Sequence, residues 1–583
     1  MKRKLICLAL LASSSFVVPA RADKNNGQPD DNRTLTTAEA GTNGAANVAT
    51  ATPASAPVES EIQQLRDLVQ EQSEELQTIR ERLDSMEEKA STINSSPAHS
   101  NSARIAAALQ PTPSAAVKSH GDSDDAQSTG NQSEEPAPLS VKIGSARFTP
   151  GGFFDFAAFF RTTNVGSGIA TSFGSIPFNN QLPQGAMTET RFSSQYSRLS
   201  FKVDADLTKS TSVTGYVESD FLGYQPSNAY VTANSDSLRL RLFFASVKHG
   251  KWEALGGQAW SLLTPNRVGL SPMPADIFYT LNEDPNFQVG LIWARQPQFR
   301  VVYHPTSFWA IGVSLENPQQ FAPASVVFPT AYFSTQFDNG SGSTSATSSA
   351  TNTDVPNLHP DIIVKTAFDW EPWGHDLHLE AAGLVRSFRV SNDLTTPTST
   401  NTITGGGGSV NLNFEVVKNL RLIANSFYSD GGGRYIFGLG PDAIVKPNGT
   451  LSGVHSGSGL AGFEWQTTPR YMLYSYYGAA YFERNFGLLG ATPASSCAGS
   501  LGFTCVGFGF PGSANSSNRA IQEGTFGVIP TLWSSPNFGK IQIITQYSYL
   551  VRSPWSIPDT TSGPNPKNAH ASMVYASFRY LLP

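Results

Sequence analysis

Closely spaced basic residues recur in this 583-residue chain, and their spacing places them on one face of extended segments. Arg239 and Arg241 are two residues apart in "SLRLRLFF", and Arg198 and Lys202 are four apart in "RLSFKVDADL". Side chains of a β-strand alternate between its two faces, so the members of each pair project to the same side. Guanidinium groups bind carboxylates through two parallel hydrogen bonds. The chemistry that this pattern indicates is the recognition of organic anions.

An apolar face runs opposite each charged face. Every second residue of 198–207 is apolar, and Leu238, Leu240 and Leu242 alternate in the same way with Arg239 and Arg241. Strict alternation is typical of a strand whose two faces meet different surroundings. Which face lies inside depends on the elements that surround these two segments.

Sixteen short segments of this alternating or aromatic-rich kind follow residue 147. The predicted strands are 150–162, 195–208, 211–224, 237–249, 251–260, 291–304, 307–318, 360–372, 375–390, 405–417, 420–428, 456–468, 469–484, 519–532, 538–552 and 569–580. Eight long connections alternate with seven tight turns, so one end of the sheet is closely connected and the other is elaborated. A secreted β-sandwich or repeat protein has no reason to sort its connections by length, and internal repeats are not seen.

These features predict an all-β fold, a transmembrane antiparallel β-barrel of about 16 strands over 141–583, with periplasmic turns and extracellular loops. The apolar faces, including Leu238, Leu240 and Leu242, then point to lipid, and the charged faces line a water-filled lumen. By this alternation we expect a set of basic residues to line the pore: Arg198, Lys202, Arg239, Arg241, Arg300, Lys365 and Arg386. The alternative is that these residues only neutralise neighbouring acids such as Glu218 and Asp220.

The third long connection, 261–290, is a candidate constriction of the pore. It carries Arg267, Asp276, Glu283 and Asp284 together with aromatic residues, a mixture that could hold an organic acid with an aromatic part. In general porin architecture this loop folds into the lumen and narrows it. The alternative is a loop that lies outside the barrel.

The first 140 residues have a different character from the rest. A basic start, a short apolar run and "PARA" predict a signal peptide over 1–22, with an uncleaved anchor as the alternative. Segments 23–58 and 91–140 have the composition of disordered linkers. Over 59–90, apolar residues alternate three and four apart, which favours an α-helical coiled coil in the periplasm over a single amphipathic helix. Beyond residue 22 no apolar run is long enough for a transmembrane helix.

Charge and cysteine usage narrow the partners. Four of the 40 basic residues lie in 1–22, so the remaining chain carries 36 basic and 46 acidic residues, a balance of −10 that argues against nucleic acid. Cys497 and Cys505, eight apart in a Gly/Ser-rich segment, suggest a small disulfide-closed loop. A metal site is disfavoured because no histidine or further cysteine lies nearby. No cofactor is expected.

Several segments together resemble the DcaP-like porins. They are "ETRFSSQYSRLSF", "YVESDFLG", "LRLRLFFASVKHGKWEALGGQAWSLL", "VSLENPQQ", "PDIIVKTAFDW", "HDLHLEAAGLVRSFR" and "FYSDGGGRYIFG", in this order. The resemblance implies a trimeric outer-membrane channel with a periplasmic coiled coil that takes up dicarboxylic and related organic anions. It also implies that Arg239, Arg241 and Arg434 contact the anion. The 319–359 loop and the "CAGSLGFTC" loop depart from the family, so the external loops and the solute can differ.

The function that the sequence favours is passive diffusion of small solutes, leaning towards organic anions such as dicarboxylates, through a homotrimeric porin in the outer membrane of a Gram-negative-type bacterium. No catalysis is expected, since no nucleophile elbow or phosphate-binding loop is found. The alternatives are a non-selective or phosphate-selective porin, and further off an outer-membrane barrel enzyme or an adhesin.

Overall fold

The computed structural model describes Gln70 and residues 139–223, 236–273, 279–282, 286–338, 356–392, 399–489, 497–499, 502–503, 505–557 and 568–583. All of these except Gln70 belong to one compact unit, 118–583. The predicted segments 1–22, 23–58, 59–90 and 91–140 lie outside the described residues, apart from Gln70 and residues 139–140. They stay predictions.

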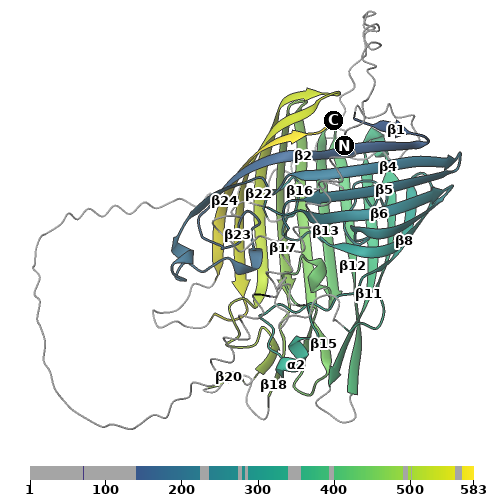
Figure 1. Cartoon of the computed structure of the whole chain (residues 1–583). Helices are drawn as coiled ribbons and strands as arrows, with labels where there is room; N and C mark the ends of the chain where they lie inside the picture. The colour runs from purple at the N-terminus through teal and green to yellow at the C-terminus, as the bar shows by residue number, and fades with distance from the viewer. Residues whose placement is uncertain are drawn as a thin grey trace, which may run out of the picture. The chain divides into compact units, whose positions relative to one another are not determined.

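Sixteen antiparallel strands form a closed ring (Figure 1). In ring order they are β2 (Ala146–Arg161), β4 (Arg198–Thr208), β5 (Thr211–Asp220), β6 (Arg239–His249), β7 (Trp252–Trp260), β8 (Arg295–Thr306), β9 (Trp309–Glu316), β10 (Asp361–Trp370), β11 (Leu377–Asn392), β12 (Ser399–Val417), β13 (Leu420–Asp430), β16 (His455–Thr468), β17 (Tyr471–Phe482), β22 (Asn518–Ser535), β23 (Gly539–Pro554) and β24 (Ala569–Leu581). The ring closes because β2 pairs with β24 on one side and with β4 on the other. The predicted barrel and its strand number are confirmed.

The two ends of the barrel differ as the connection lengths predict. Tight turns join alternate pairs of strands at one end, where β1 (Val141–Ile143) and the end of β24 also lie (Figure 1). The long connections at the other end carry the small elements. They are η1 (Phe173–Ser175), η2 (Gln184–Ala186), β3 (Glu189–Ser193), α2 (Ala331–Ser334), η4 (Gly433–Tyr435), β14 (Ala443–Val445), β15 (Leu451–Gly453), β18 (Asn485–Leu488), β19 (Ala498–Gly499), β20 (Gly502–Phe503) and β21 (Cys505–Phe508). The short helix η3 (Pro372–Gly374) lies in a turn.

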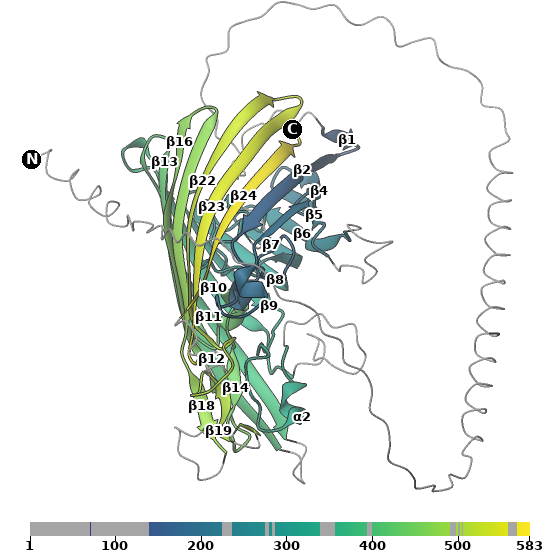
Figure 2. The same ribbon diagram turned by 90° about the vertical axis from the view of Figure 1, so that its left-hand side faces the viewer.

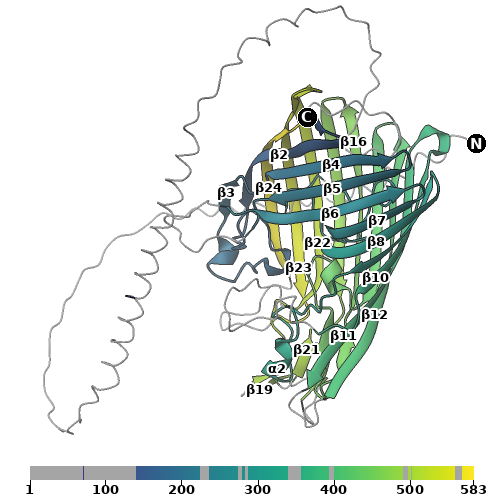
Figure 3. The same cartoon turned by 45° about the vertical axis from the view of Figure 1, so that its right-hand side comes forward.

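The wall of the barrel is uneven in height. Strands β4 to β10 have between 8 and 12 residues, whereas β11, β12, β22 and β23 have between 16 and 19. Figure 2 shows the tall wall with β22 and β23, and Figure 3 shows β4, β5 and β6 of the low wall lying side by side, with β2 next to β4. Long loops therefore have a low side over which they can enter the barrel.

The outer face of the ring is apolar. Its side chains are between 40% and 62% exposed and come from strands all around the barrel: Phe154, Phe156, Leu199, Leu240, Phe243, Phe299, Val313, Val364, Val385, Val410, Tyr477, Phe526, Tyr547, Val574 and Phe578. The residues between them on each strand are mostly buried. Among the described helices, none has the length and apolar character to cross a bilayer.

One predicted side-chain direction is wrong. Leu242 was expected on the outside with Leu238 and Leu240, but it is fully buried, while Phe243 is 62% exposed. The register of β5 against β6 shifts between Glu218 and Ser219, so that two residues of β6 face one of β5 at this point. Such a β-bulge inserts one residue and reverses the alternation beyond it. The residues that follow Arg241 on β6 therefore lie on the face opposite to the predicted one, whereas Leu238 and Leu240 before it lie outside as predicted.

Candidate functional site

The third long connection crosses the lumen from one wall to the other. We call residues 261–294, which join β7 to β8, the crossing loop. The Leu281 amide donates to the Gln546 side chain on β23 (2.9 Å), and the Val289 amide donates to Glu523 on β22 (3.0 Å). Strand β22 is eight strands away from β8 in either direction around the sixteen-strand ring. The loop therefore reaches the opposite wall, as the sequence predicted for a constriction loop.

Two further residues of the crossing loop, Arg267 and Asn282, also contact side chains of the barrel wall. Arg267 forms an ion pair with Glu464 on β16 at 2.7 Å. Burial disfavours the charge of Arg267, but Glu464 outweighs this and keeps the pKa of Arg267 above its ordinary value. The side chain of Asn282 bonds both Glu523 and Gln546 on the far wall. These polar contacts satisfy groups that the loop buries inside the barrel.

Glycines of the far wall make room for the crossing loop. A Cβ added to Gly478 on β17 would overlap the carbonyl oxygen of Val289. Gly290 adopts φ +94°, and a Cβ there would overlap the carbonyl oxygen of Gly459 on β16. Only glycine combines this close approach with that backbone conformation at little cost. The backbone of the loop thus lies directly against the backbone of the wall.

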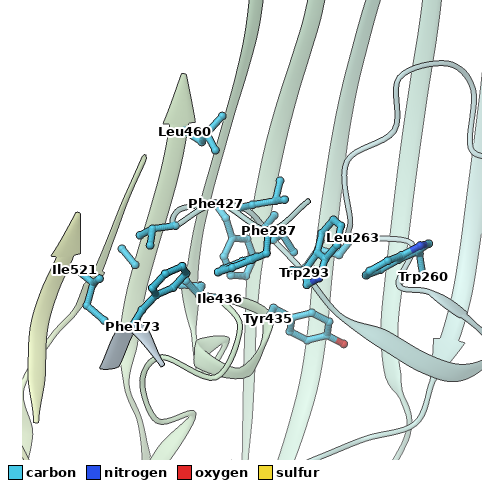
Figure 4. Close-up of a cluster of buried hydrophobic side chains, with 14 of the residues drawn as sticks. Phe173, Trp260, Leu263, Phe287, Trp293, Phe427, Tyr435, Ile436, Leu460 and Ile521 are labelled. Atoms are coloured by element: carbon cyan, nitrogen blue, oxygen red, sulfur yellow. The ribbon is translucent and has the colours of Figure 1, made fainter. Parts of the chain in front are cut away.

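Aromatic rings from three different loops meet inside the barrel. Phe287 of the crossing loop stacks on Phe173 of the first long loop (ring centroids 5.7 Å apart) and on Phe437 of the sixth (4.1 Å). Figure 4 shows Phe287 among Phe173, Trp293, Ile436 and wall residues. We call this buried apolar set the lumen cluster: Phe173, Phe287, Trp293, Phe427, Tyr435, Ile436, Leu460 and Ile521. It fills the interior towards the long-loop end.

The arginines of β4 and β6 are engaged with acids of β5. Arg241 contacts Glu218 (2.6 Å) and Asp220 (2.8 Å), and Arg239 contacts Asp220 (2.6 Å). Arg198 lies 3.6 Å from Glu218. Arg241 is fully buried, whereas the side chain of Arg239 is 31% exposed. These contacts agree with the alternative reading of the sequence, in which the arginines neutralise Glu218 and Asp220. In this group three guanidiniums contact two carboxylates.

A second charged group ties the crossing loop to β10 and β11. Lys365 contacts Glu380 at 2.8 Å and donates to the Thr264 carbonyl and the Asn266 side chain. The Asn266 amide donates to the same carboxylate of Glu380 (2.9 Å). His378 lies 2.9 Å from Glu380. Lys365 is thus 1% exposed and serves as an anchor for the loop.

The third charged group joins β10, β11 and the sixth loop. Arg386 contacts Asp361 (3.1 Å) and Asp442 (2.9 Å), and Arg434 lies 3.7 Å from Asp361. The Tyr435 hydroxyl also donates to Asp361 (2.9 Å). Burial raises the pKa of Asp442, and Arg386 opposes that shift. The side chains of the two arginines and the two aspartates are each at most 4% exposed. Arg386 and Arg434 are therefore buried in the packed region.

The remaining predicted pore residues separate into buried and exposed ones. Arg300 is 2% exposed and donates to Gln298 (3.0 Å) and the Trp260 carbonyl. Lys202 pairs with Asp204 at 3.1 Å, and their side chains are 38% and 35% exposed. Lys202 lies toward the tight-turn end, beyond the reach of the loops. Of the predicted set, Lys202 and Arg239 are the residues whose side chains are more than 30% exposed.

Other predicted residues have simpler outcomes. Asp276, Glu283 and Asp284 lie outside the described residues, so their role in the constriction stays a prediction. Cys497 and Cys505 form a disulfide, with Cα atoms 5.0 Å apart, in the seventh long loop. Within the described ranges, no group of three histidine, cysteine or carboxylate side chains has the arrangement of a metal site.

Sequence reasoning missed the residues that receive the loops. Gln546 and Glu523 are ordinary inward positions of their strands, and nothing local marks them as loop contacts. Arg552 on β23 donates to the Ile176 carbonyl of the first loop, at 2.6 and 2.9 Å. The inward glycine Gly478 is a signal that could have been used, because a glycine inside a strand often marks close backbone approach.

Comparison with known proteins gives similarities to solved structures. No family model and no curated protein matches the chain. The outer membrane channel DcaP of Acinetobacter baumannii, the kind of channel that the sequence motifs resemble, is 16% identical with a TM-score of 0.49, over 75% of this chain and 99% of that one. OprB of Pseudomonas putida is 11% identical (TM-score 0.40; 74% and 94% covered). OmpT, an outer membrane protein of Vibrio cholerae, is also 11% identical (TM-score 0.38; 76% and 99%).

Proposed function

We propose that this protein is an outer-membrane channel for passive diffusion of small solutes, with a preference for organic anions. The observation that carries the proposal is a closed sixteen-strand ring with an apolar outer face and a charged inner face, crossed by one loop. A ring of this size leaves space for an aqueous path. An apolar outer face flanked by long loops and short turns fits a bilayer-spanning barrel.

The crossing loop sets the narrowest part of the path. It divides the interior at the level of Gln546 and Glu523, where the lumen cluster also lies. A solute entering from the long-loop end meets loop residues before it reaches the wide tight-turn half. Selectivity in such channels is decided by the charges beside the constriction.

The preference for anions rests on an imbalance of charge along the wall. Arg198, Arg239 and Arg241 contact Glu218 and Asp220, so three guanidiniums meet two carboxylates in this group. On β23, three strands from β4, Arg552 donates to backbone carbonyls and an amide oxygen, and no carboxylate of the described residues is among these acceptors. The half-exposed guanidinium of Arg239 is the member of the arginine group that a passing carboxylate can reach.

The wider context follows the resemblance to DcaP-like porins. We propose uptake of dicarboxylates or related organic anions, assembly as a homotrimer, and a periplasmic stalk formed by 59–90. The 75% of the chain aligned with the Acinetobacter channel leaves room for such an N-terminal segment.

A second candidate is a barrel whose loops do the work and whose interior is closed. The lumen cluster favours it, because fully buried aromatic rings from three loops occupy the middle of the barrel. A receptor or adhesin would need a rigid loop platform and no conducting path. Conductance separates the two candidates.

The test is the single-channel current of the purified protein in a planar bilayer under a salt gradient, followed by addition of succinate or phthalate. We expect an anion-selective reversal potential and flickering block by the dicarboxylate. Arg239→Ser should weaken the block and shift the reversal potential towards cations, because it removes a positive charge beside the path. Lys209→Ser, in an exposed turn, is the matched control. Cation selectivity without block would contradict the anion preference. The absence of any current would support the second candidate, a barrel with a closed interior.

A further inference from the structure

One tryptophan at the long-loop rim of the barrel has two arginines beside its ring. The guanidinium carbons of Arg484 and Arg519 lie 5.5 and 5.8 Å from the ring centroid of Trp555. Arg484 follows the end of β17, Arg519 lies at the start of β22, and Trp555 follows the end of β23. These strands are neighbours in the ring. Their ends therefore bring two positive charges to one indole, and we call these three residues the Arg–Trp cluster.

Two hydrogen bonds and a second ring fix the indole of Trp555. Its Nε1 donates to the Phe482 carbonyl of β17 (3.0 Å), and its backbone amide donates to the Ser517 carbonyl (2.9 Å). The ring also meets the ring of Tyr481 edge to face, with centroids 6.2 Å apart. Because a carbonyl already uses the indole donor, the guanidiniums meet the π system of the ring, which attracts cations.

The charges of Arg484 and Arg519 are not neutralised by the part of the barrel that the structure describes. Both side chains are exposed, and among the described residues neither guanidinium has a hydrogen bond or an ion pair. Glu483 is next to Arg484 in the sequence, but it contacts His455 of β16 at 3.4 Å. The inward Arg241, in contrast, contacts two carboxylates. The Arg–Trp cluster is therefore open to an anion from outside the chain.

The position of the cluster indicates where this anion comes from. Tyr477, Tyr481 and Tyr549 belong to the apolar outer face of β17 and β23 and are between 42% and 55% exposed. Tyr481, which contacts Trp555, is paired with Ala520, the residue after Arg519. Tyrosine and tryptophan collect where a bilayer meets water. The cluster thus lies at the edge of the apolar face, at the level of the lipid headgroups on the long-loop side.

We propose that the Arg–Trp cluster binds a phosphate group of an outer-leaflet lipid. Guanidinium groups bind phosphate through two parallel hydrogen bonds, and a phosphomonoester carries up to two negative charges, which suits two arginines. An acyl chain of the same lipid then lies on the outer face beside Tyr481 and Tyr477. The proposal rests on the membrane location in the proposed function, and it is independent of conduction and of the solute.

The experiment is native mass spectrometry of the full chain in detergent with added lipid A, a glycolipid with two phosphate groups. Arg484→Gln combined with Arg519→Gln should raise the lipid A concentration for half-maximal binding about tenfold or more, because each arginine near a membrane surface attracts anionic headgroups. Arg470→Gln combined with Lys418→Gln, which changes two exposed residues of tight turns, is the matched control and should leave it unchanged. Equal losses in the two double variants overturn the proposal.

A change of lipid separates phosphate contacts from acyl-chain contacts. Lipid A without its two phosphates should bind the wild-type chain about tenfold more weakly, and equal binding of the two lipids overturns the proposal. Inorganic phosphate at the concentration of the lipid should displace none of the bound lipid A. Complete displacement would assign the cluster to free phosphate and overturn the assignment to a lipid.

Two further measurements keep the result decisive. If the double variant does not fold, Arg519→Gln alone should raise the half-maximal concentration about threefold or more, and an unchanged value overturns the proposal. Planar-bilayer currents of the double variant should equal those of the wild-type chain, since the cluster lies outside the lumen. A loss of lipid binding and a loss of anion preference are therefore separate results, and a barrel without current can still bind the lipid.

Discussion

The two halves of the barrel interior differ although the same sixteen strands build both. Towards the tight turns, charged pairs such as Lys202–Asp204 are more than a third exposed. Towards the long loops, the side chains of pairs such as Arg386–Asp442 and Lys365–Glu380 are each at most 3% exposed. The strands alternate identically in both halves. The difference comes from the loops that enter one half, so loop packing and not wall composition decides how much of the lumen is open.

The largest effect is expected where the crossing loop touches the wall. In Gly478→Val the new side chain overlaps the Val289 carbonyl, so the crossing loop must move away from β17 at this point. We expect the single-channel conductance to rise at least about twofold, since the loop no longer divides the lumen. Gly383→Val is the control, because a Cβ there meets no atom within 4 Å. An unchanged conductance would mean that this loop does not limit the path.

The next effect concerns the centre of the lumen cluster. Phe287→Ala removes a fully buried ring that contacts two other loops, and should lower the free energy of unfolding by about 3–5 kcal/mol. Denaturant unfolding in detergent micelles measures this. Phe538→Ala, in a tight turn where Phe538 is 64% exposed, should change it by much less. Equal losses for both variants would show that the long-loop half is not packed more tightly than the turn end.

The last comparison is between two ion pairs, of which the exposed one should give the smallest effect of all. Glu380→Ala removes a buried carboxylate that both Lys365 and His378 contact. Because a buried charge then loses its partner, the free energy of unfolding should fall by about 3–5 kcal/mol. Asp376→Ala removes the partner of Arg421 at the tight-turn end, where the side chains are 69% and 27% exposed, and should cost about 0–1 kcal/mol. The same unfolding assay gives both values. A cost for Asp376→Ala as large as that for Glu380→Ala would remove the distinction between the two halves.

Most of the wall could be predicted from the sequence. Alternation is a local signal, and every one of the sixteen predicted strands overlaps a strand of the ring. Leu242 was placed wrongly because a bulge at Arg241 depends on how β6 pairs with β5, and single-strand periodicity does not contain that information.

The contents of the lumen could be predicted only in part. That the third long loop carries mixed charged and aromatic residues is visible in the sequence, and so is the inward direction of Arg386 and Lys365. The partners are not visible, because Leu281 and Gln546 are 265 residues apart and meet only through the closed ring. The lumen cluster likewise joins loops that are distant along the chain.

The most direct test of the crossing loop is a chemical cross-link between Leu281→Cys and Gln546→Cys, made with a short bis-maleimide whose spacer bridges two thiols too far apart for a disulfide. The Leu281 amide lies 2.9 Å from the end of the Gln546 side chain, so the two thiols should lie within reach of one reagent molecule, and mass spectrometry of the digested protein should find the cross-linked peptides. Pairing Leu281→Cys with Leu532→Cys, whose side chain is 53% exposed on β22, should give none. If each thiol of the first pair reacts with a separate reagent molecule and no cross-linked peptide forms, the loop does not cross the lumen.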